Sequence, residues 1–161
     1  MKVALPKPII KGRVRILRPA EYEQLRKGAE TLENQTRADG LLLTGLRYVE
    51  AQRLQNNPDW VDGRFVHLPE HSQKKVRRRQ KERWVKLSSK GVSILPYFLK
   101  TTPLPNWKAW TQDLRRWAAR SAMEPEGLGP KTTRKTWESW LVASYPERAL
   151  EIFLSQGHTQ E

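Results

Sequence analysis

Four short stretches of the sequence carry the residue types that bind phosphate or move protons. In chain order they are Thr44-Gly45-Leu46-Arg47 followed by Glu50, a basic segment with Lys74 and Lys75, Lys131-Thr132-Thr133-Arg134, and Gln156-Gly157-His158-Thr159. An arginine fork can hold two oxygens of one phosphate and stays charged at any working pH. Lys131 and Arg134 would share one helix face, where two cations repel unless an anion lies between them. These residues indicate chemistry on a phosphate group.

Each of these residues also has an ordinary structural interpretation. Arg47 and Glu50 could form a surface ion pair, which contributes little to stability. Arg134 could be one more charge on a basic helix, and His158 could stabilise a helix end. The segment 71–90 holds nine Lys or Arg residues and one acid, Glu82. It could be a solvated loop or an arm that follows DNA phosphates.

The order and spacing of the four motifs resemble the catalytic domain of tyrosine recombinases, the phage-integrase family, over roughly residues 19–161. In that family a TGLR-x-x-E stretch carries the first active-site arginine, and a β-hairpin carries a lysine. An H/K-x-x-R box carries the second arginine, and a later GH box carries a histidine. The resemblance thus implies as catalytic residues Arg47, Lys75, Lys131, Arg134 and His158, with Glu50 in support of Arg47.

The sequence departs from the family pattern in three places. Lys131 stands where most members have histidine, which is similar to the archaeal and archaeal-virus branch. The hairpin connection is long and basic, so Lys75 is the preferred catalytic lysine and Lys74 the second choice. The chain ends at Glu161, whereas the family's tyrosine nucleophile follows roughly nine residues after the GH histidine. The resemblance therefore implies a chain that binds DNA without cleaving it.

The resemblance also implies a reaction, the transfer of a DNA phosphodiester to a tyrosine oxygen and later back to a DNA hydroxyl. Arg47 and Arg134 would hold the two non-bridging oxygens as charge develops on them. Lys75 would protonate the leaving 5′ oxygen. Lys131 and His158 would hydrogen-bond the phosphate or assist proton transfer to and from the tyrosine. No metal and no cofactor is expected, and the predicted DNA-binding residues are Lys74, Arg77, Arg78, Arg79 and Lys81.

Composition agrees with a polyanionic partner. The 161 residues suit one domain, and 30 Lys and Arg against 17 Asp and Glu give a net charge of +13. Such a chain favours nucleic acid, because each phosphate contact releases counterions. The chain has no cysteine, no histidine pattern with ligand spacing and no apolar run of membrane-spanning length. We expect a soluble, cytoplasmic, nucleoid-associated protein with no membrane partner.

The sequence patterns predict a mainly α domain with a small antiparallel β-hairpin or sheet, in the tyrosine-recombinase fold. Residues 1–18 are expected to form a basic, extended arm or linker remnant, followed by the catalytic domain over 19–161. Strands are expected at 64–68 and 83–87, and helices at about 19–33, 40–55, 89–100, 106–121, 131–144 and 147–156. The tryptophans at helical spacing are expected in the core, as are Trp60 and Trp84.

Three functions remain open at this point. The first is a recombinase catalytic domain, which binds double-stranded DNA and assembles as a tetramer when full length, although this chain alone could be a monomer. The second is a non-cleaving DNA-binding module derived from an integrase. The third is an unrelated basic helical protein that binds RNA. Only the first two require Arg47, Lys131, Arg134 and His158 to converge.

Overall fold

The computed structural model describes residues 6–69 and 82–156, which form helices around one core and two small antiparallel sheets. The helices are α1 (Pro19–Gly28), α2 (Leu32–Thr44), α3 (Tyr48–Asn56), α4 (Ser89–Lys100), α5 (Trp107–Arg120), α6 (Thr132–Ser144) and α7 (Ala149–Ser155). The strands are β1 (Ile9–Lys11), β2 (Val14–Ile16), β3 (Val61–Asp62), β4 (Phe65–Leu68) and β5 (Arg83–Lys86). The predicted class, mainly helical with a small antiparallel sheet, is confirmed.

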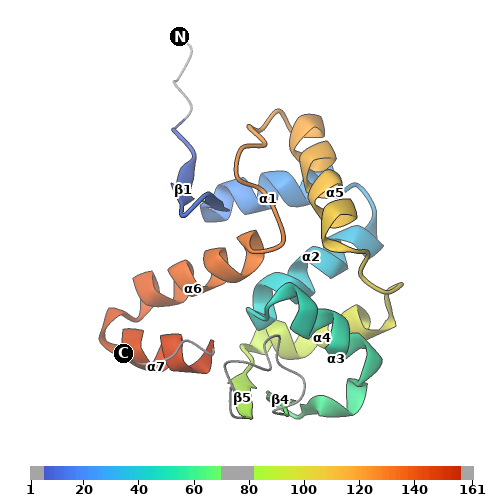
Figure 1. The fold of residues 1–161 in the computed structure, drawn as a ribbon, viewed down its shortest axis with the longest axis vertical. Helices are drawn as coiled ribbons and strands as arrows, with labels where there is room; N and C mark the ends of the chain where they lie inside the picture. The colour runs from blue at the N-terminus through green and yellow to red at the C-terminus, as the bar shows by residue number, and fades with distance from the viewer. Residues whose placement is uncertain (1–5, 70–81, 157–161) are drawn as a thin grey trace.

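Helix α2 is the central element, because both α4 and α6 pack against it, as Figure 1 shows. The predicted stripe Trp110, Leu114 and Trp117 is fully buried on α5 and faces α1. Trp84 is different, since it is 47% exposed and stacks on the ring of His67 at 4.2 Å, so its prediction as core was wrong. Within the described ranges, no helix combines the length and apolarity that a membrane crossing needs.

The predicted hairpin forms between β4 and β5, with Val66 opposite Val85, and β3 adds a third strand. Side chains alternate between the two faces of a strand. Val66 and Val85 are buried, whereas Phe65 and Trp84 lie on the exposed face. This alternation also turns Arg83 towards the buried side, beside α3.

Two of the predicted helices are divided differently in the structure. The expected helix at 40–55 is interrupted, because α2 ends at Thr44 and Gly45 adopts a left-handed conformation with φ of 63°. The expected helix at 19–33 ends at Gly28, and the next begins after Thr31, whose hydroxyl accepts the backbone N–H of Asn34 at 3.2 Å. A left-handed C-cap and a threonine N-cap are the local causes of these boundaries.

The expected N-terminal arm is instead part of the folded domain. Residues 9–16 form the β1–β2 hairpin, which packs on α6. Arg15 and Leu17 are 2% and 1% exposed. The backbone N–H of Leu17 donates to the Thr136 hydroxyl at 3.1 Å, and Trp140 donates its indole N–H to the Leu17 carbonyl at 2.9 Å. The prediction of an extended arm over 1–18 was therefore wrong for its described part.

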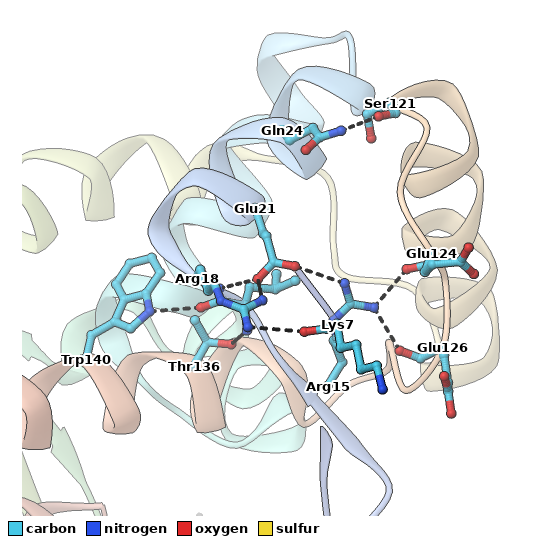
Figure 2. Close-up of polar contacts among 11 residues, drawn as sticks. Lys7, Arg15, Arg18, Glu21, Gln24, Ser121, Glu124, Glu126, Thr136 and Trp140 are labelled. Atoms are coloured by element: carbon cyan, nitrogen blue, oxygen red, sulfur yellow. Dashed lines mark hydrogen bonds and ion pairs between the residues drawn. The ribbon is translucent and has the colours of Figure 1, made fainter. Parts of the chain in front are cut away.

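Arg15 joins β2 to the start of α1 and to the distant segment 124–126, as Figure 2 shows. Its guanidinium donates to the carbonyls of Glu124 and Glu126 at 2.8 and 3.2 Å and to the Glu21 carboxylate at 3.2 Å. Arg18 approaches the same carboxylate from the surface at 3.1 Å. Burial would raise the pKa of Glu21, but the Arg18 backbone N–H and both guanidiniums hold it below its ordinary value.

We expect Arg15→Met to lower the free energy of unfolding by about 3–5 kcal/mol, because it leaves Glu21 and two carbonyls without their buried partner. The matched control is Arg18→Met, which removes the second, 36%-exposed partner of the same carboxylate. It should cost less than about 1 kcal/mol. Urea denaturation followed by circular dichroism measures both, and equal losses would show that Arg15 has no special role.

Candidate functional site

The first predicted motif forms the sharp turn between α2 and α3. Gly45 caps α2, and Arg47 is the N-cap residue of α3. The backbone N–H of Arg47 donates to Glu50 Oε1 at 2.9 Å, which closes the first turn of α3. Gly45 is required because of its positive φ and because a Cβ there would lie 2.7 Å from Gln156 Nε2 and 2.9 Å from Trp137 Cδ1.

Glu50 is fully buried and holds two arginines. Arg83 of β5 donates to both carboxylate oxygens, at 2.6 and 2.9 Å, and Arg47 Nη1 lies 3.4 Å from Oε2. Burial would raise the pKa of Glu50, but the Arg83 hydrogen bonds and charge, with those of Arg47, keep it below its usual 4.5. The carboxylate therefore stays ionised and fixes both guanidiniums.

Arg134 lies in the first turn of α6 and is 7% exposed. It donates to the Gly45 carbonyl at 3.1 Å and also to the Gln156 carbonyl. These contacts bring the second predicted arginine to the turn that carries the first. Burial and the nearby charge of Arg47 lower the pKa of Arg134 to about 10.

Arg47, Glu50, Arg83 and Arg134 are together called the arginine cluster below. Glu50 and Glu138 raise the pKa of Arg134, whereas Arg47 and Arg83 lower it. Among the described residues, three guanidiniums and two carboxylates therefore influence one another here. Exposure of the side chains rises from 0% at Glu50 and 10% at Arg83 to 23% at Arg47, so the cluster reaches solvent beside Arg47. A buried excess of positive charge is unfavourable unless an anion offsets it.

The remaining predicted residues are placed as follows. Lys131 is exposed at the start of α6, and its side chain makes no hydrogen bond or ion pair with a described residue. It precedes Arg134 by one helical turn but does not join the arginine cluster. The other predicted residues lie outside the described part of the chain, namely Lys74, Lys75, Arg77, Arg78, Arg79, Lys81 and His158.

Two residues of the site were missed by sequence reasoning. Arg83 donates to Glu50 and, through Nε, to the Ser155 carbonyl at 3.1 Å, so it connects β5 to α3 and to the end of α7. Gln156 supplies the second carbonyl for Arg134, and its side chain packs against Gly45. Arg83 could have been found from strand alternation. It stands two positions before Val85 and therefore on the same, inward face of the strand, where a charged residue is unusual.

The described tyrosines do not complete the arginine cluster. Tyr22 and Tyr48 are buried, with their hydroxyls donated to Asp39 and to the Pro105 carbonyl. Burial raises the pKa of both phenols above 10. Tyr97 and Tyr145 are exposed on α4 and at the end of α6. Among described residues, no group of three His, Asp or Glu side chains is placed to hold a metal ion.

No family model, curated protein or solved structure matches the chain.

We expect Glu50→Gln to lower the free energy of unfolding at pH 7 by about 3–5 kcal/mol, because it leaves buried guanidiniums without their counter-charge. A carboxyl whose pKa is depressed by folding stabilises the protein above the unfolded value and loses that effect as pH falls. The difference between wild type and variant should therefore shrink below pH 4.5. Urea denaturation across pH measures it.

Glu151→Gln is the matched control, since Glu151 is 65% exposed and pairs with Arg148 on the surface of α7. Its stability should equal that of wild type at pH 7. A Glu50→Gln protein as stable as this control would show that the carboxylate does not hold the arginine cluster together.

Proposed function

We propose that this chain is the phosphate-clamping domain of a tyrosine-type site-specific DNA recombinase. The observation that carries the proposal is the meeting of Arg47 and Arg134, 87 positions apart in the sequence, at one turn of the chain. Two guanidiniums fixed beside each other can bind two non-bridging oxygens of one phosphate. The order of the motifs along the chain supports the same proposal by resemblance.

The charge of the arginine cluster favours a phosphate ligand. The guanidiniums of its described residues lie in a partly buried place, where an anion gains more from each contact than it would in water. Arg47, the most exposed member, would meet the phosphate first, and Arg134 would receive it from inside. Lys131, exposed one turn before Arg134, would add a flexible third cation. In this proposal Glu50 and Arg83 are positioning residues that do not touch DNA.

The proposed chemistry is electrostatic stabilisation of a phosphoryl transfer. Negative charge grows on the non-bridging oxygens in the transition state, and donors already held in place cost no reorganisation at that moment. Lys75 and His158 keep the roles that the resemblance implies, as general acid and as phosphate ligand or proton relay. Double-stranded DNA is the partner, and oligomerisation on two duplexes belongs to the same proposal.

Arg47→Gln should weaken the binding of inorganic phosphate by about 10- to 100-fold, because it removes a charge-assisted contact. It should also reduce the salt dependence of binding to a mixed-sequence DNA duplex. The matched control is Arg26→Gln, which removes an arginine that pairs with Asp39 on a distant part of the core. Isothermal titration with phosphate and fluorescence anisotropy with DNA provide the two readouts. Equal effects of the two substitutions would exclude a phosphate clamp at Arg47.

The alternative function is a DNA-binding module that never cleaved, and orthovanadate separates the two. Orthovanadate is tetrahedral in water and becomes pentacoordinate only when a nucleophile and a leaving hydroxyl bind it, so phenol in place of the tyrosine and a duplex end with a free 5′ hydroxyl are supplied with it. A site built for phosphoryl transfer binds this pentacoordinate analogue at least about 100-fold more tightly than the ground-state anion. With these two ligands present, we expect wild type to bind orthovanadate more tightly than phosphate and Arg47→Gln to lose this preference. Equal binding of the two anions by wild type would favour the non-cleaving module.

A further inference from the structure

The tip of the β1–β2 hairpin is a two-residue turn with an unfavourable residue order. Lys11 pairs with Val14, and Gly12 and Arg13 between them both have positive φ, 55° and 67°. These values belong to the tight hairpin turn that matches the twist of two strands. Its second position strongly favours glycine, yet the glycine stands first here and an arginine stands second.

Arg13 gains no hydrogen bond or ion pair with a described residue from this strained position. Its side chain is exposed. Lys11 beside it is exposed as well. A residue kept in the left-handed region without a local contact to compensate suggests a role outside the fold. A cation in that role would bind an anionic partner.

The stem of the hairpin is held rigidly next to the segment that leads into α6. Arg15, two residues after Arg13, donates its backbone N–H to the Gly127 carbonyl at 2.8 Å. A Cβ on Gly127 would lie 2.9 Å from the Arg15 nitrogen, so strand and turn pack without space between them. Four residues later the chain reaches Lys131 and then Arg134. The stem of the hairpin is therefore fixed to the turn that precedes α6, the helix that carries Arg134.

We propose that the Gly12-Arg13 tip is a second DNA contact, in which Arg13 binds a backbone phosphate of the duplex held at the arginine cluster. This inference rests on the proposed function. The net charge of +13 and the exposed Lys11 favour a polyanion over an acidic peptide or a neutral surface. A phosphate contact from a rigid hairpin would orient the duplex without reading its sequence.

The test compares three variants by fluorescence anisotropy with a mixed-sequence duplex at several salt concentrations. Arg13→Gly removes the cation and the strained Cβ. Arg13→Lys keeps the charge, and Arg115→Ala removes an equal charge from the exposed face of α5. We expect Arg13→Gly to weaken binding and to make the salt dependence shallower by about 0.9 in log–log slope, the value of one phosphate contact. Arg13→Lys and Arg115→Ala should bind like wild type.

Thermal unfolding of the same variants adds a second measurement, the melting temperature, which should not fall when the DNA affinity falls. Since glycine tolerates positive φ, Arg13→Gly should melt no lower than wild type although it binds DNA less well. A lower melting temperature would show that Arg13 serves the fold and would overturn the inference. So would losses of affinity that are equal in Arg13→Gly and Arg115→Ala.

The inference and the proposed function can fail separately. If wild type binds neither duplex nor phosphate, both the proposed function and the tip contact are refuted. If wild type binds and Arg47→Gln weakens it, but Arg13→Gly leaves affinity and salt slope unchanged, only the tip contact is refuted.

Discussion

The candidate site depends on the hydrogen bonds and ion pairs of the Glu50 carboxylate. This carboxylate caps α3 through the Arg47 backbone and takes both terminal nitrogens of Arg83. Through Arg83 it also reaches the Ser155 carbonyl at the end of α7. One buried negative charge thus connects a helix start, a strand and a helix end, and it allows several guanidiniums to lie where water is scarce.

Among the described residues around Glu50, guanidiniums outnumber carboxylates. A domain of this size folds with only a small net free energy, so an uncompensated buried cation is a notable cost. Burial and the charge of Arg47 lower the pKa of Arg134 to about 10, so the charged form of Arg134 is disfavoured in this place. In the proposed function a bound phosphate would offset this cost, and the folded domain would be more stable with the anion than without it.

The sequence predicted the helices with strong periodicity well, because their apolar spacing and breakers are local. The helix expected at 89–100 matches α4, and the expected strands match β4 and β5 closely. The break at Gly45 was missed because the apolar residues on both sides keep helical spacing through the turn. The N-terminal hairpin was missed because its burial comes from contacts with residues 124–136, far along the chain.

The residues of the candidate site could be predicted only where they stand in a sequence motif that by itself indicates phosphate binding. Arg47, Glu50 and Arg134 stand in recognisable motifs, and the structure brings them together. Arg83 stands in none, since its role comes from β-strand alternation. Gln156 opens the fourth motif, but its role comes from its main-chain carbonyl and from its close approach to Gly45. Arg134 is held by two main-chain carbonyls, those of Gly45 and Gln156. Every residue type has such a carbonyl, so a different side chain at position 156 could still keep the guanidinium in place. A comparison of residue identities would therefore detect little of this part of the site.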